Sequence, residues 1–188
     1  MGKAKITDNI ENIYKHAKNL YLPKVKKNPI FTIGVHVRRG ELYVVDSDRM
    51  LPNAYYINIV KKLIKICNEC DIEFIVELYT EVSTKQLTIT GKHPGICDRI
   101  KEDIVIDPKN NKIEDFDVIP NLHKYINEDT LNTYDRMINS DILITSRSCF
   151  SCSASYIKRG ISIYHNFWHR MMTKDIEVND PKIKEKVK

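Results

Sequence analysis

The sequence of 188 residues lacks the features that mark several classes of protein. No stretch approaches the roughly 18 consecutive apolar residues of a membrane-spanning helix. The opening segment 1–8 has none of the apolar region of a signal peptide. There is no Asn-x-Ser/Thr sequon, and five cysteines form an odd set that does not suit a secreted disulfide framework. These absences predict a soluble, cytoplasmic protein without a membrane partner.

The sequence also lacks a long run of charge of one sign. The formal net charge is +5, and the lysines are spread through amphipathic segments. Charge therefore gives little support to nucleic-acid binding, although a weak nucleic-acid binder stays open as a hypothesis. A content of 42% hydrophobic and 29% charged residues is typical of a folded globular protein, and the length suits one domain.

Hydrophobic periodicity divides the chain into three parts. Segment 1–29 is predicted to hold an amphipathic helix over 8–22 and a basic connection. Segment 30–173 alternates strand and helix patterns, and the charged tail 174–188 is expected to fray. The predicted elements of the middle part are strands at 30–37, 73–80, near 103–106, near 116–119, 142–145 and 161–164, and helices at 52–70, from 129–130 onward and at 150–159. This alternation predicts an α/β fold with a parallel sheet.

Two consecutive arginines follow the first predicted strand. Arg38 and Arg39 come at its carboxyl end, which is where open α/β sheets place their ligands. Gly40 lets the backbone approach closely, and two guanidinium groups suit an anion that needs bidentate contacts. The pattern predicts a phosphate or pyrophosphate site.

A serine-rich segment lies at a later junction of strand and helix. In Ser146-Arg147-Ser148-Cys149-Phe150-Ser151, the small hydroxyl residues would let a phosphate approach the positive end of a helix. Ser148 could alternatively do no more than cap that helix. In a parallel sheet both this junction and the arginines would lie on the same edge, which favours one shared anion site.

These residues resemble a known family. The run from His36 to Glu41 is similar to the His-x-Arg-Arg-x-Asp motif of the α1,2-, α1,6- and protein O-fucosyltransferase superfamily. The run from Met137 to Ala154 resembles its later motif, Ala-Asp-x-Leu-Ile-x-Ser-x-Ser-Ser-Phe-Ser-x-x-Ala. The resemblance spans roughly 30–165, and two motifs in the right order are more specific than one. It departs from the family in Glu41, Arg147 and Cys149.

The resemblance implies a Rossmann-like domain with helices on both faces of the sheet, like the donor-binding half of a GT-B glycosyltransferase. The implied reaction is inverting, metal-independent transfer of fucose from GDP-fucose to a glycan hydroxyl, with no further cofactor. Arg39 and Arg38 would neutralise the diphosphate. The implied donor-binding residues are His36, Gly40, Ser146, Ser148, Phe150 and Ser151. His36 could also be only a hydrogen-bonded histidine at a strand end.

An inverting transfer needs a carboxylate beside the acceptor hydroxyl. The α1,6 branch of the family has one shortly after its motif aspartate, and the ungapped equivalent here is Asp46. Asp46 is therefore the candidate base, unless it is simply a solvated loop aspartate. Glu41, in place of the motif aspartate, would orient an arginine.

Other readings of the sequence stay open. The chain could be a catalytically silent module that binds GDP or another anion, either as a fragment or as a partner subunit. An acceptor lobe could come from dimerisation or from a missing domain. The pairs Cys67/Cys70 and Cys149/Cys152 could together hold zinc, although both fall on predicted helices and free cysteine is commonly a small core residue.

Overall fold

The computed structural model describes residues 12, 27–40, 42, 49–82, 87–89, 104–106, 111–158, 160–167 and 176–178. The helix predicted over 8–22 lies outside these residues except for Asn12. Most of the segment from 174 onward also lies outside them.

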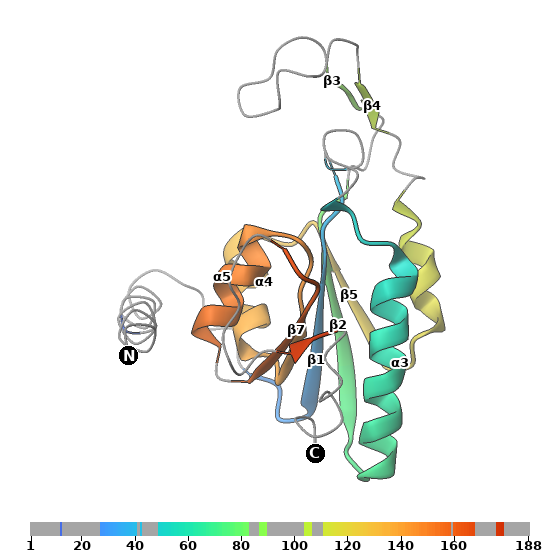
Figure 1. Cartoon of the computed structure of the whole chain (residues 1–188), viewed down its shortest axis with the longest axis vertical. Helices are drawn as coiled ribbons and strands as arrows, with labels where there is room; N and C mark the ends of the chain where they lie inside the picture. The colour runs from blue at the N-terminus through green and yellow to red at the C-terminus, as the bar shows by residue number, and fades with distance from the viewer. Residues whose placement is uncertain are drawn as a thin grey trace.

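A six-stranded parallel sheet forms the centre of the molecule (Figure 1). Its strands are β1 (Phe31–Val37), β2 (Phe74–Thr80), β5 (Leu122–Ile126), β6 (Ile142–Ile144), β7 (Ile161–Tyr164) and β8 (Ile176–Glu177). The order across the sheet is β5-β2-β1-β6-β7-β8, so β1 lies inside it and the direction of strand addition reverses between β1 and β6. This is the doubly wound order of a Rossmann-like fold, in which ligands bind at the carboxyl ends beside the reversal.

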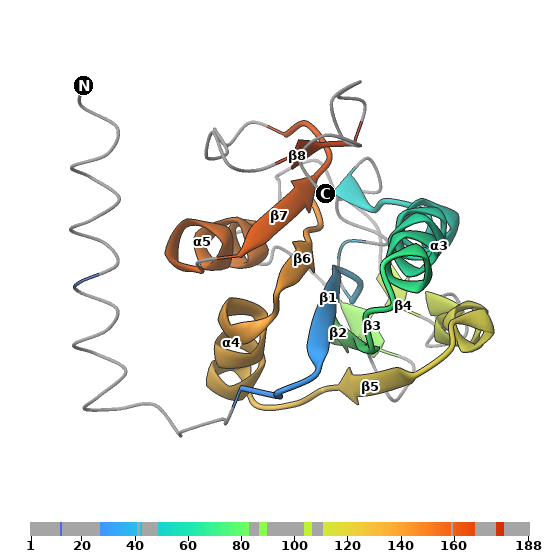
Figure 2. The same cartoon turned by 90° about the horizontal axis from the view of Figure 1, so that it is seen from below.

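Helices cover both faces of the sheet (Figure 2). One face carries α3 (Asn53–Glu69) and the 3-10 helix η3 (Ile113–Val118). The other carries α4 (Thr130–Asn139) and α5 (Cys149–Ile157). The predicted α/β class and the parallel sheet are therefore confirmed.

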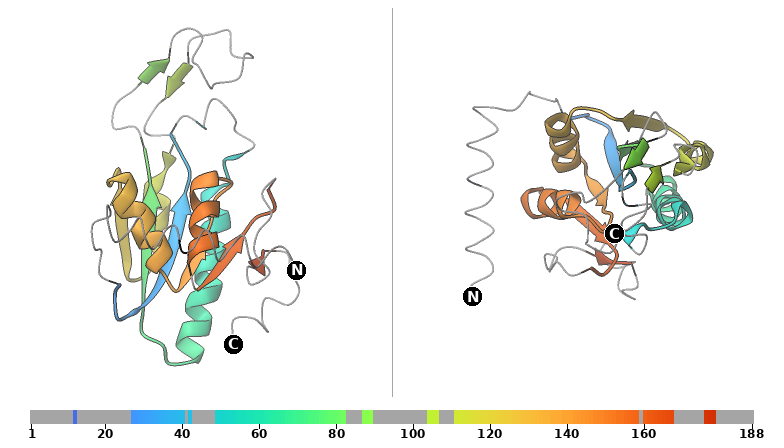
Figure 3. Two further views of the ribbon diagram at one scale, coloured as in Figure 1. Left: turned by 90° about the vertical axis from the view of Figure 1, so that its left-hand side faces the viewer. Right: turned by 90° about the horizontal axis from the view of Figure 1, so that it is seen from above.

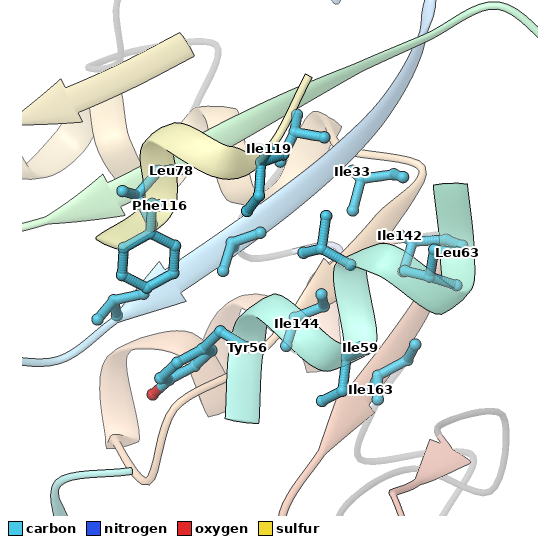
Figure 4. Packing of buried hydrophobic residues seen from close by; sticks show 14 of the residues in the cluster. Ile33, Tyr56, Ile59, Leu63, Leu78, Phe116, Ile119, Ile142, Ile144 and Ile163 are labelled. Carbon is cyan, nitrogen blue, oxygen red and sulfur yellow. The ribbon is translucent and has the colours of Figure 1, made fainter. Parts of the chain in front are cut away.

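The main core lies between the sheet and α3 (Figure 4). The helix buries apolar residues that recur at helical spacing: Tyr56, Ile59, Val60, Leu63 and Cys67. Alternate residues of β1 meet them, because successive side chains of a strand point to opposite faces. A smaller cluster of Tyr79, Met137, Leu143 and Ala154 lies on the α4/α5 face.

The predicted strand near 116–119 is wrong. Ile113, Phe116 and Ile119 are buried at intervals of three, while Val118 is 61% exposed. This spacing fits a 3-10 turn packed on α3 and not the alternation of a strand. The strand of this region is β5, which begins at Leu122.

Besides β5, two other strands among the described residues were not predicted. Leu87–Ile89 forms β3, which pairs antiparallel with β4 (Ile104–Ile106) at the position predicted near 103–106. This pair lies beyond the carboxyl end of β2 (Figure 3). Ile176–Glu177 forms β8 within the segment that was expected to fray, and Ile176 is fully buried. Ile176 pairs with Ile163 of β7 and both lie in the main core, so burial of this apolar side chain stabilises β8 although charged residues surround it in the sequence.

Candidate functional site

A cavity of about 770 Å³ opens at the carboxyl edge of the sheet. Its walls come from the ends of β1, β2 and β5 and from the first turns of α4 and α5, and it lies beside the reversal between β1 and β6. The lining residues are His36, Val37, Arg38, Arg49, Thr80, Glu81, Val82, Asn127, Glu128, Thr130, Thr133, Ser148, Cys149 and Phe150.

His36 forms a buried part of the cavity wall. Its Nδ1 lies 2.8 Å from Oγ of Ser146, and its ring meets Phe150 edge-on at 5.7 Å between centroids. Burial, assisted by the charge of Arg38, lowers the pKa of His36 from 6.5 to about 3. The ring is therefore neutral at pH 7. Among the described residues the side chain of His36 has no other hydrogen bond.

Arg38 contributes a positive charge to the cavity wall. Its side chain is 27% exposed, and its NH1 lies 3.7 Å from a carboxylate oxygen of Glu81, whose side chain is 78% exposed. Such an exposed ion pair contributes little free energy.

Arg39 points to the opposite face of the sheet and does not line the cavity. The side chain is 3% exposed, and it donates hydrogen bonds to the carbonyl oxygen of Arg38 and to Oδ1 of Asn53. The guanidinium also lies over the ring of Tyr56, 5.9 Å from its centroid. Burial lowers the pKa of Arg39, and Tyr56 opposes that shift. Arg39 thus ties the end of β1 to the start of α3.

Asn53 was not recognised from the sequence as more than a helix start. Besides accepting from Arg39, its Nδ2 donates to the carbonyl oxygen of Lys112 at 2.8 Å and to Oδ2 of Asp115 at 3.0 Å. One amide therefore joins the end of β1, α3 and η3. No local pattern could signal this role, because its partners are distant in sequence.

The serine-rich segment divides its tasks. Ser148 is the N-cap of α5, and its Oγ accepts a hydrogen bond from the backbone NH of Phe150 at 3.3 Å. The capping interpretation is therefore confirmed, and Ser148 also lines the cavity. Ser146 holds His36, whereas Ser151 is fully buried and donates weakly to the carbonyl oxygens of Ser146 and Ser148.

Phe150 supplies an apolar wall of the cavity. Its ring packs against His36 and lies 5.2 Å from the ring of Tyr134 between centroids. Gly40 has a φ of +70°, which explains why glycine follows the two arginines. Glu41 and Asp46 lie outside the described residues.

Most of the polar residues that line the cavity were not predicted as site residues, among them Arg49, Thr80, Asn127 and Glu128. Thr80 donates from Oγ1 to the carbonyl oxygen of Val37 at 2.7 Å, which joins the ends of β1 and β2. Glu128 follows β5, and the incorrect strand prediction near 116–119 hid the fact that a strand ends just before it.

The four described cysteines do not form one zinc site. Cys67 and Cys70 belong to the end of α3, and Cys149 and Cys152 lie on α5 on the other face of the sheet. Within the described ranges no three His, Cys, Asp or Glu side chains are grouped so that they could hold a metal ion. None of the described helices is both long and apolar enough to cross a membrane.

No protein-family model matches the sequence, and no curated protein matches it either. Among solved structures, the chain is similar to POFUT1 in complex with GDP in one crystal form (13% identity, TM-score 0.38, 85% of this chain and 47% of that one). A second POFUT1 complex with GDP has 12% identity and a TM-score of 0.35, over 83% of this chain and 47% of that one. POFUT1 in complex with GDP-fucose has 12% identity and a TM-score of 0.34, over 85% and 46%. The chain spans about half the length of these proteins, and TM-scores in this range leave its function to be inferred from the cavity residues.

Proposed function

We propose that the cavity binds the diphosphate of a nucleotide sugar, and that the chain is the donor-binding part of an inverting, metal-independent fucosyltransferase that uses GDP-fucose and a glycan acceptor. One observation carries the proposal: Arg38 and the first turn of α5 line one cavity beside the reversal of strand order. The two motifs that resemble the fucosyltransferase superfamily contribute these same two elements.

The chemistry of the wall suits a leaving diphosphate. A fixed guanidinium and the positive end of a helix stabilise the charge that develops when the glycosidic bond breaks. The neutral ring of His36 would offer Nε2 as a hydrogen-bonding group, and the ring of Phe150 would pack against the nucleoside. In this proposal Arg39 holds the carbonyl group of Arg38 in place, and Ser146 orients His36.

The step that removes the acceptor proton is assigned to Asp46, and Glu41 would orient an arginine. A catalytically silent GDP-binding module is the second candidate. It is favoured by one observation: the two carboxylates that line the cavity among the described residues, Glu81 and Glu128, both pair with arginines. Hydrolysis of GDP-fucose that falls on Asp46→Asn would rule out the silent module.

The proposal is tested by calorimetry of GDP binding. Arg38→Ala is expected to weaken GDP binding about 30-fold, since it removes charge-assisted hydrogen bonds to phosphate. Guanosine, which lacks the diphosphate, should bind both proteins equally. Lys62→Ala is the matched control, because it removes an exposed positive charge from α3 on the other face. Absence of GDP binding by the wild type, or equal affinity after Arg38→Ala, would refute the proposal.

A further inference from the structure

Glu128 places a carboxylate in the wall of a cavity that is proposed to bind an anion. It directly follows the loop residue Asn127 after β5, and its side chain is 19% exposed. A bare carboxylate there would repel a diphosphate, because a wall of low dielectric screens like charges poorly. An anion can bind in this cavity only if a positive charge neutralises the carboxylate of Glu128.

Arg136 supplies that charge, and it reaches Glu128 from behind the wall. Its Nε donates to both carboxylate oxygens of Glu128, at 3.0 and 3.1 Å, and its guanidinium stacks on Tyr125, 3.9 Å from the ring centroid. Arg136 does not line this cavity, so its effect on the proposed ligand would act through Glu128.

A second carboxylate fixes the position of Arg136. Oε1 of Glu77 lies 3.9 Å from NH1 of Arg136, and Glu77 also accepts hydrogen bonds from the hydroxyls of Tyr79 at 2.6 Å and Tyr125 at 3.3 Å. Burial lowers the pKa of Arg136, but the hydrogen bond to Glu128 and the charges of Tyr125, Glu128 and Glu77 raise it above its ordinary value. The guanidinium stays charged throughout the working range of pH.

The far side of Arg136 opens on a second cavity, of about 330 Å³. Thr32, Glu77, Tyr125 and Asn139 are among its other lining residues. Arg136 thus stands in the partition between two cavities on the same face of the sheet, with Glu128 on one side and Glu77 on the other. Such a fixed partner sets the charge of the wall without occupying the volume of the first cavity.

We infer that Arg136 is a positioning residue that cancels the charge of Glu128 and so lets the first cavity accept a diphosphate. The inference rests on the proposed function and goes beyond it, because it assigns a role to a residue outside the site. Loss of Arg136 would leave Glu128 as an uncompensated negative charge in the wall. A like charge at this range is expected to weaken diphosphate binding about tenfold at low salt.

The test compares Arg136→Met, Glu128→Gln and the double variant. Calorimetry at low salt would measure GDP, pyrophosphate and guanosine. Arg136→Met should lose about tenfold in affinity for GDP and pyrophosphate but not for guanosine, and adding Glu128→Gln should restore the loss. Glu128→Gln alone should raise the affinity for GDP about threefold, since the pair then carries a net positive charge. Arg136→Lys keeps the charge and should stay within about threefold of the wild type.

The outcomes separate this inference from the proposed function. No rescue in the double variant, or an equal loss of guanosine binding, would mean that Arg136 acts only through the fold and would overturn the inference. Weaker GDP binding by Glu128→Gln would mean that Glu128 contacts the ligand and would overturn it too, even if Arg136→Met failed to fold. If the wild type binds pyrophosphate but not GDP, the proposed function fails and the pyrophosphate series decides the inference. Binding of neither refutes both.

Discussion

Acidification is expected to destabilise this protein through His36. Burial, with the nearby charge of Arg38, lowers the pKa of this histidine from 6.5 to about 3 in the folded state. Between pH 6.5 and pH 3, His36 is protonated in the unfolded chain but stays neutral in the folded protein. The stabilising contribution is therefore complete above pH 6.5 and declines as the pH falls toward 3.

The magnitude follows from proton linkage. Between pH 7.5 and pH 5.0 the unfolded state gains almost one proton at His36, while the folded state gains almost none. Integrated over this interval, the free energy of unfolding should fall by about 2 kcal/mol. Because the folded-state pKa lies well below 5, the size of the loss is set by the unfolded-state value. A loss of this size is a substantial part of the stability of an ordinary domain.

Urea unfolding at a series of pH values would measure this loss. His36→Asn removes the titration while leaving a side-chain oxygen that can pair with Ser146, so about 2 kcal/mol of the pH dependence should disappear. His123→Asn is the matched control, because His123 is exposed on β5 and its replacement should leave the slope intact. The same pH dependence in His36→Asn as in the wild type would contradict the assignment of a buried neutral imidazole.

Two further predictions concern the two ends of α5, at Gly160 and at Ser148. A Cβ at Gly160 would overlap the carbonyl oxygen of Asp141, which accepts hydrogen bonds from Ile161 N and Lys158 Nζ at 3.1 Å each. Gly160→Ala should therefore lower the free energy of unfolding, measured in urea, by about 3 kcal/mol. An unchanged midpoint would contradict the close approach of Gly160 to the carbonyl oxygen of Asp141. Ser148→Ala should lower the free energy of unfolding by about 1 kcal/mol, because it removes the cap of α5. Ser148→Thr can still cap the helix and should lose much less. Equal losses in the two variants would argue against capping.

Strongly patterned segments could be predicted closely. The strand predicted at 30–37 is Phe31–Val37 in the structure, because a short β-branched run has few other stable conformations. The strand at 161–164 and the helix over 52–70 were likewise recovered. The failure near 116–119 has a physical cause, since apolar residues three apart fit a 3-10 turn whose stability comes from contact with α3.

The structure brings together part of the set of residues that was predicted to form a site. Arg38, His36, Ser148 and Phe150 do line one cavity, as the shared sheet edge implied. Arg39 does not line it, and alternation along the strand was a signal that neighbouring arginines would point to opposite faces. The pairing of Glu128 with Arg136 could not be predicted from the sequence, because it depends on where β5 and α4 meet.

By itself, the sequence determined the alternation of strands and helices and the presence of arginines and serines at strand ends, because both depend on short-range periodicity and chain direction. Tertiary structure decided which face of the sheet holds the cavity, and hence that Arg38 lines it while Arg39 packs on α3. It also decided which charges cancel: the Arg136 guanidinium meets Glu128 and Glu77 only after β2, β5 and α4 have packed. Electrostatic pairing depends on distances in space, and these are fixed only by the folded chain.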